Sequence, residues 1–215
     1  MNNTNKGRLA IFRKSLLGSF LALSFLVVMA PSARANLVFN STQGFCCFKV
    51  ELQQVDPNDV FVNVTLTGGA TLFANTGNPF PTNHPGFGFN LAGAAITSAN
   101  ILTPTNLSTF HIGSDVTSPN FGSFAYYFDI PGNGTSGNDA GPLSFTVTRA
   151  TGILESDFTA NAAGYLFVAD ILNAAGGTGL SAINTPGTSV PEPVSVSLVG
   201  GGLLGLGLLR KRFCA

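Results

Sequence analysis

Residues 60–67 read Val60-Phe61-Val62-Asn63-Val64-Thr65-Leu66-Thr67 and alternate along the chain. The even-numbered positions are Val or Leu, and the odd-numbered positions from residue 63 onward are Asn or Thr. A period of two is typical of a strand with one buried face and one solvated face. The stretch Leu143–Thr148 alternates in the same way. These two segments predict antiparallel β-structure in the middle of the chain.

Seven further segments have the composition of short strands: Leu37–Asn40, Cys46–Leu52, Ala70–Ala74, Phe87–Leu91, Ile96–Leu102, Phe124–Ile130 and Tyr165–Ile171. Clusters of Gly, Pro and Asn separate them and are typical of turns. Short strands at this spacing predict an all-β fold, an antiparallel and jelly-roll-like β-sandwich, for an ectodomain over residues 36–184. One short helix is expected at Ser156–Ala163, because Glu155 and Asp157 would favour a helix N-terminus.

Charge is scarce and unevenly placed. Charged residues make up 9% of the 215 residues, against roughly 25% in an ordinary soluble domain. Between Asn36 and Ser189 only Lys49 and Arg149 are basic, whereas nine residues are acidic, which gives this stretch a formal charge of −7. Nucleic-acid binding needs clustered Lys and Arg, so the composition argues against a nucleic-acid partner.

The N-terminus has the three parts of a secretory signal peptide. A basic stretch (Lys6–Lys14) precedes an apolar stretch (Leu16–Ala30), and small residues follow at Ala33 and Ala35. The apolar stretch is about 15 residues, shorter than the roughly 20 that a stable membrane span needs. We expect signal peptidase to remove residues 1–35 and the rest to be exported. An uncleaved N-terminal anchor is the alternative.

The C-terminus carries a second targeting pattern. A polar linker at residues 185–189 leads to Pro191, Glu192 and Pro193, which precede an apolar, Gly-rich run at Val194–Leu209. Its 16 residues predict a single transmembrane helix, short but workable in a thin bilayer. The basic cluster Arg210, Lys211 and Arg212 would then keep the tail on the cytoplasmic side. An ordinary single-pass anchor is one interpretation of this segment.

The order of these elements resembles the PEP-CTERM sorting signal of Gram-negative bacteria, here over residues 190–215. The resemblance implies that exosortase, a membrane-embedded processing enzyme, recognises Pro191, Glu192 and Pro193 and that the segment after them is removed. It also implies an association with exopolysaccharide and biofilm matrix. The chain ends Phe213-Cys214-Ala215 rather than at the basic cluster, which departs from the pattern.

Adjacent cysteines at Cys46 and Cys47 leave three interpretations open. Exported proteins usually pair their cysteines, but neighbouring residues can bridge only through a strained ring. The pair is therefore one buried and one exposed thiol, a vicinal disulfide or an intermolecular bridge. No third ligand at a metal-site spacing accompanies them, so no metal or other cofactor is expected.

No residue set points to catalysis. His111, Ser114 and Asp115 would supply a triad, but they lie too close along one expected strand, and no nucleophile-elbow motif is present. Glu51 and Glu155 are the only glutamates of the ectodomain, so a glycosidase pair has little support. His84 is expected in a surface loop. The Asn- and Asp-containing loop at residues 132–141 lacks the acid spacing of an EF-hand.

The sequence therefore predicts a non-catalytic protein of the cell envelope or extracellular matrix. It would be exported across the inner membrane, anchored there transiently by its C-terminal helix, and then moved to the cell surface or matrix. The alternative function is that of a carbohydrate- or calcium-binding β-sandwich module.

Overall fold

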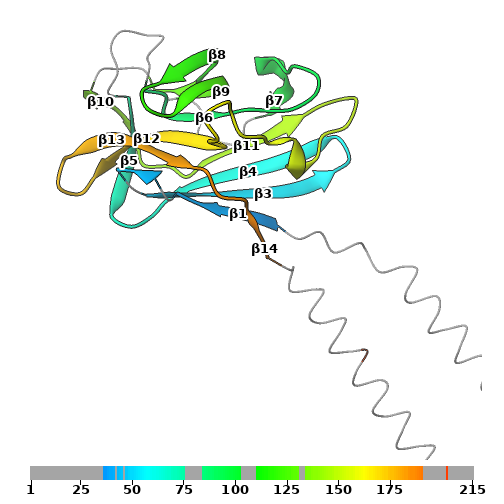
Figure 1. Cartoon of the computed structure of the whole chain (residues 1–215), viewed down its shortest axis with the longest axis horizontal. Coiled ribbons are helices and arrows are strands. Elements are labelled where there is room, and N and C mark those ends of the chain that lie inside the picture. The colour runs from blue at the N-terminus through cyan, green and yellow to red at the C-terminus, as the bar shows by residue number, and fades with distance from the viewer. Residues whose placement is uncertain are drawn as a thin grey trace, which may run out of the picture. The chain divides into compact units, whose positions relative to one another are not determined.

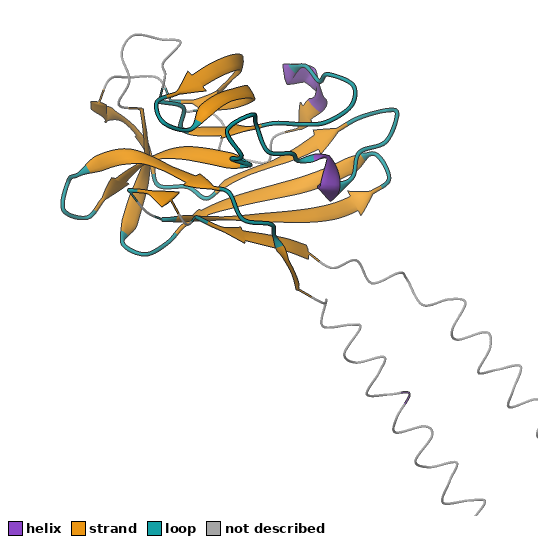
Figure 2. Cartoon of the chain, in the orientation of Figure 1, coloured by secondary structure: helices purple, strands orange, loops and turns teal. Residues whose placement is uncertain are grey.

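The computed structural model describes residues 36–41, 43–45, 47–75, 84–102, 110–130 and 134–190, together with Gly202. Arg34–Pro191 form one compact unit that contains strands β1 to β14. Among the residues of this unit that the structure describes, two 3₁₀ turns and otherwise only turns and loops interrupt the strands (Figures 1 and 2). The predicted all-β class is confirmed.

The strands form two antiparallel sheets. The six-stranded sheet has the order β14 (Thr188–Val190), β1 (Asn36–Asn40), β3 (Phe48–Asp56), β4 (Asp59–Leu66), β11 (Leu143–Thr148) and β7 (Ile101–Leu102). The main path of the eight-stranded sheet is β10 (Gly134–Asp139), β5 (Ala70–Asn75), β12 (Phe167–Asn173), β6 (Phe87–Phe89), β9 (Gly122–Asp129) and β8 (His111–Ser118). Two further strands, β13 (Thr178–Ile183) and β2 (Gln43–Gly44), continue from the other edge of β12. The two layers are visible in Figure 1.

Strand β4 follows the alternation seen in the sequence. Val60, Val62 and Val64 have no exposed surface, and the residues between them are half-buried. Val62 lies opposite Leu52 of β3 and Phe145 of β11, both also fully buried. The alternation therefore fixes which face of the six-stranded sheet is turned to the core.

Phenylalanine rings from both sheets meet in this core. Phe145 of the six-stranded sheet lies 4.5 Å from Phe128 and 5.6 Å from Phe89, measured between ring centroids, and both partners belong to the eight-stranded sheet. Phe87 stacks on Phe167 at 5.8 Å within the eight-stranded sheet. One apolar cluster thus joins the inner faces of both sheets, as expected for a sandwich-like fold.

Strand β12 is buried on both faces. Phe167 and Ala169 belong to the main core, whereas Val168 belongs to a second cluster on the other side of the sheet, with Tyr127 among its members. Along one edge β12 pairs with β13, and along the other it pairs first with β6 and then with β5. Three strands therefore share β12, which makes it the centre of the eight-stranded sheet.

The short helix expected at Ser156–Ala163 is wrong. Only a 3₁₀ turn forms there, at η2 (Glu155–Asp157), and the chain then extends so that Phe158 bridges Leu91. Phe158 is 4% exposed and contacts the rings of Phe89 and Phe167. Burial of this ring requires extended backbone where local charge favoured a helix.

Two other expectations also need correction. The strand expected over Ile96–Leu102 is mostly a turn, since η1 occupies Ser98–Asn100 and only β7 is extended. The polar linker expected at residues 185–189 ends inside a strand, because Thr188–Val190 form β14 and pair with β1. An edge strand needs few apolar side chains, so its polar sequence gave no strand signal.

Phe87→Ala should destabilise the domain by about 3–5 kcal/mol, because Phe87 is fully buried and its ring contacts four other aromatic rings. Phe45→Ala is the matched control, since Phe45 is 37% exposed and should cost only about 1 kcal/mol. Urea unfolding of both variants measures the difference. Equal losses would mean that the phenylalanine cluster does not dominate the stability of the core.

Candidate functional site

The two ends of the described domain lie side by side on neighbouring strands. Asn36, the first residue of β1, is paired with Val190, the last residue of β14, and Val38 is paired with Thr188. The Thr188 hydroxyl donates a hydrogen bond to the Val38 carbonyl at 3.4 Å. Pro191 follows Val190 directly in the sequence. The last described residue of this unit is therefore paired in the sheet and directly precedes the predicted sorting motif.

Most residues of the predicted targeting signals lie outside the described part of the chain. This holds for the cleavage-site residues Ala33 and Ala35, for Pro191, Glu192 and Pro193, and for Arg210, Lys211 and Arg212. Within the described residues no helix is long and apolar enough to cross a membrane. Of the expected span Val194–Leu209, the structure describes only Gly202.

Cys47 is disulfide-bonded. The two other cysteines of the chain, Cys46 and Cys214, lie outside the described residues. A disulfide at Cys47 argues against the first of the three sequence interpretations, in which both members of the pair are thiols.

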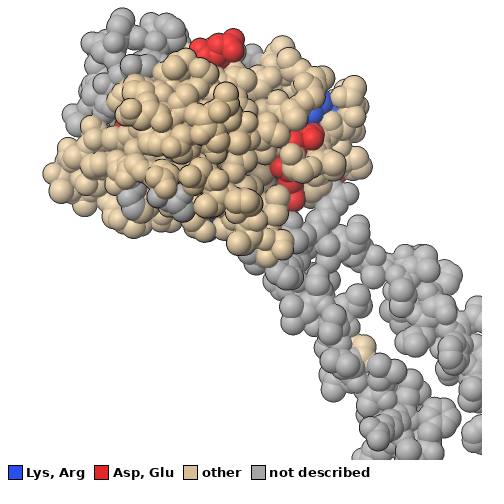
Figure 3. All heavy atoms as spheres, viewed as in Figure 1, with Lys and Arg blue, Asp and Glu red and all other residues tan. Residues whose placement is uncertain are grey.

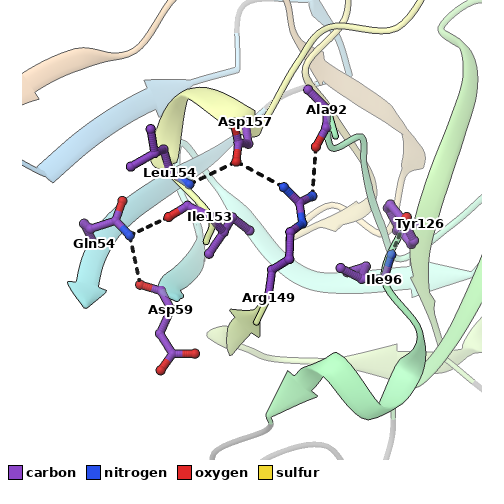
Figure 4. Close-up of polar contacts among 9 residues, drawn as sticks. All are labelled: Gln54, Asp59, Ala92, Ile96, Tyr126, Arg149, Ile153, Leu154 and Asp157. Atoms are coloured by element: carbon purple, nitrogen blue, oxygen red, sulfur yellow. Dashed lines mark hydrogen bonds and ion pairs between the residues drawn. The ribbon is translucent and has the colours of Figure 1, made fainter. Parts of the chain in front are cut away.

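Arg149 is the centre of a polar network at one end of the sandwich (Figure 4). Its guanidinium donates to the Asp157 carboxylate at 3.1 Å and to the Ala92 carbonyl at 2.8 Å. The same Asp157 oxygen accepts a hydrogen bond from the backbone of Leu154 at 3.0 Å. Arg149 is 7% exposed. Its buried side chain links the loop after β6, which contains Ala92, to the turn after β11, which contains Asp157.

The two glutamates considered for glycoside hydrolysis belong to separate networks. Glu51 lies on the solvated face of the six-stranded sheet, where it accepts bonds from Lys49 at 3.0 Å and Asn63 at 3.1 Å. Glu155 accepts a bond from the backbone of Gln54 at 2.8 Å. The Gln54 side chain in turn donates to the Ile153 carbonyl at 2.7 Å. Both carboxylates hold neighbouring strands and turns together.

The pKa of Glu51 lies below its ordinary value of 4.5. The hydrogen bond from Lys49 is the main cause, and burial opposes it by raising the pKa. The bond from Asn63 and the positive charge of Lys49 lower the pKa further. The ionised form of Glu51 is therefore the form that the folded sheet stabilises.

His84 lies in the loop directly before β6, as expected, and its side chain is 26% exposed. Its Nδ1 atom lies 3.6 Å from the carboxylate of Asp170, which is fully buried in β12. The Asp170 backbone donates to the Pro85 carbonyl at 3.0 Å, at the point where the edge of β12 passes from β6 to β5. This pairing was missed because Asp170 stands in an apolar run and is distant from His84 in sequence.

A second buried carboxylate, that of Asp129, lies at the end of β9. It accepts a hydrogen bond from the backbone of Ile130 at 2.9 Å. Burial raises the pKa of Tyr127 on the same strand, and the charge of Asp129 raises it further.

No group of three or more His, Cys, Asp or Glu suited to a metal is found among the residues that the structure describes.

The possible triad residues lie along one strand. Ser114 and Asp115 are consecutive and exposed on β8, and Asp115 has a positive φ of 61°. His111 begins the same strand, opposite Asp129.

The loop expected at residues 132–141 is in part a strand, because Gly134–Asp139 form β10, which pairs with β5.

Charged side chains are sparse on the surface seen in Figure 3, where most atoms belong to uncharged residues. Comparison of the chain with family models, curated proteins and solved structures finds no match.

Arg149→Met should destabilise the domain by about 2–4 kcal/mol, because it leaves Asp157 and the Ala92 carbonyl without their buried donor. Lys49→Met is the matched control, since it removes the other basic residue of the domain, whose side chain is 31% exposed. Its cost should stay below about 1 kcal/mol. Thermal unfolding of both variants measures the contrast, and similar losses would contradict the anchoring role of Arg149.

Glu51→Gln should lower stability at neutral pH, and the loss should shrink as the pH falls. A carboxylate whose folded pKa is depressed stabilises the fold above its unfolded pKa, and this contribution disappears as the pH drops through the folded pKa. Denaturant unfolding at pH 7 and at about pH 3 checks the sign. A loss that is the same at both pH values would exclude the ionised form as the stabilising one.

Proposed function

We propose that the protein is an exported, non-catalytic component of the cell envelope or extracellular matrix, sorted by exosortase through Pro191, Glu192 and Pro193. The sequence of signals at its two ends motivates this proposal. Signal peptidase would remove residues 1–35, and the C-terminal segment would anchor the chain in the inner membrane until exosortase acts. Release would then bring the domain to the cell surface or matrix.

The limits of the folded domain are the observation that best supports the proposal. Strand β1 begins at Asn36, directly after the expected cleavage site, and β14 ends at Val190, directly before the motif. These strands pair with each other, so the described fold is closed by the residues that lie directly inside the two predicted signals. A domain bounded in this way would stay intact when both signals are removed.

The jelly-roll-like description of the sandwich is part of the same proposal. It is supported by the way the chain crosses between the sheets, from β4 to β5 and again from β10 to β11. A sandwich of this kind offers a broad solvated face as well as loops at its ends.

The alternative, a carbohydrate-binding module, is favoured by one feature of the six-stranded sheet. Its solvated face carries half-buried polar side chains on β4 and β11, and the half-buried ring of Phe61 lies among them. Phe61 is paired with Gln53 on one side and Thr146 on the other. An aromatic ring between hydrogen-bonding side chains suits a sugar ring. Calorimetric titration of the domain with matrix polysaccharide separates a binding role from a structural one.

Glu192→Ala should leave the full-length chain in the membrane fraction, because it removes the charged residue of the proposed recognition motif. Intact mass of the membrane and released fractions from the native cells measures the outcome. The parent chain should start at Asn36 and end near the motif, and any added mass would identify what its new end is joined to.

Glu51→Ala serves as the control for this experiment. It makes the same substitution on the solvated face of the domain and should be processed as the parent is. Normal release of the Glu192→Ala chain would contradict sorting through the motif, as would a parent chain that retains Ala215 in every fraction.

A further inference from the structure

We propose that β14 is a detachable strand whose pairing with β1 controls access of the processing enzyme to the motif at residues 191–193. The inference rests on the proposed sorting function and names the surface that the enzyme must engage: the backbone of Thr188–Val190. In the paired state this backbone belongs to the sheet. In the detached state it is free to enter the enzyme.

The position of β14 in the sequence raises the question of access. An enzyme that cuts a peptide chain commonly binds it in extended form, and main-chain hydrogen bonds then supply much of the affinity. The residues directly before the motif are those of β14, and their backbone already pairs with β1 from Asn36 to Val38. The same strand therefore cannot serve β1 and an enzyme cleft through the same hydrogen bonds.

The contacts of β14 are of the kind that open locally. It is three residues long, lies at the edge of its sheet, and exposes both Thr188 and Ser189. The preceding strand is held much more firmly, because β13 pairs with β12 over six positions and buries Ala182 and Ile183 completely. Elements with few buried contacts open at low cost while the rest stays folded. Detachment should therefore stop at Ile183.

Besides its pairing with β1, the paired position of β14 is supported by a contact of the residue just before it. The ring of Phe39, which is 5% exposed, lies against Gly187, and a Cβ at that position would stand 2.7 Å from the ring. Glycine thus allows the backbone before β14 to cover the Phe39 ring. Detachment of β14 must break this specific contact. The strand therefore has two distinct states, paired and detached, rather than a continuous range of partly frayed states.

Detachment of β14 would also allow the motif to move away from the sheet. Residues 184–190 separate the firmly held Ile183 from Pro191. At about 3.3–3.6 Å per extended residue, this segment can span roughly 20–25 Å. With β14 paired, the residue directly before the motif is instead held in the sheet. The pairing therefore decides whether the motif meets the enzyme on a tether or against the body of the domain.

The test locks the strand and then supplies the tether separately. Val38→Cys with Thr188→Cys joins two paired positions of β1 and β14 and prevents detachment. Lys49→Cys with Thr65→Cys joins β3 to β4 and is the control, because it cross-links the same sheet without touching β14. A third chain carries the β1–β14 cross-link and about eight Gly and Ser residues inserted between Val190 and Pro191.

Pulse–chase of each full chain in the native cells, with cross-links verified by intact mass, gives the rate of removal of the C-terminal segment. The β1–β14 cross-link should slow removal about tenfold, because only the detached fraction is competent. The control should match the parent, and the inserted tether should restore the rate to within about twofold of it.

Two outcomes would overturn the proposal in different ways. If the β1–β14 cross-linked chain is processed as fast as the parent, or the inserted tether does not rescue it, the strand does not control access, while the sorting function stands. If the parent itself keeps its C-terminal segment, the sorting function fails and the control by β14 fails with it.

Discussion

The contact between Phe145 and Phe128 spans the two sheets at 4.5 Å between ring centroids, and the rest of the domain is arranged around it. The chain has no Trp, so phenylalanine supplies nearly all of the large aromatic surface of the core, and twelve of the 19 Phe residues are buried in the described part of the chain. When rings from two sheets meet edge-on or in offset stacks, they set the distance between the sheets and prevent one sheet from sliding over the other. The loops, the Arg149 network and the paired residues Asn36 and Val190 are positioned by the strands of these two sheets.

The sequence predicted the strands that carry several large apolar residues and missed strands such as β8, β13 and β14, even though β8 and β13 contribute buried residues. Alternating apolar residues made β4 and β11 evident. Strand β8 (HIGSDVTS) and strand β14 carry mostly small or polar side chains, so neither was among the segments predicted from apolar composition. At residues 155–158 the local charges favoured a helix, but burial of the Phe158 ring required extended chain. Tertiary packing decided each of these cases.

The predictions for the candidate site likewise depended on whether the signal was local in the sequence. The prediction of targeting signals rests on local order along the chain, because such signals are short linear segments. Local order could not predict that Arg149 would bind Ala92 or that His84 would lie beside Asp170, since these contacts depend on how distant strands pair. It also treated residues 185–189 as a passive connection, whereas Ser189 is paired with Leu37.

The pairing of Asn36 with Val190 has a mechanical consequence. Because the two strands are antiparallel and their outer ends meet, a force that pulls the ends apart acts across one backbone hydrogen bond at a time, as in opening a zipper. A force applied to the C-terminus alone, with the opposite end of the sandwich held by a polymer, reaches the phenylalanine core only after β14 has peeled away. The short edge strand would yield first under tension and leave the sandwich whole.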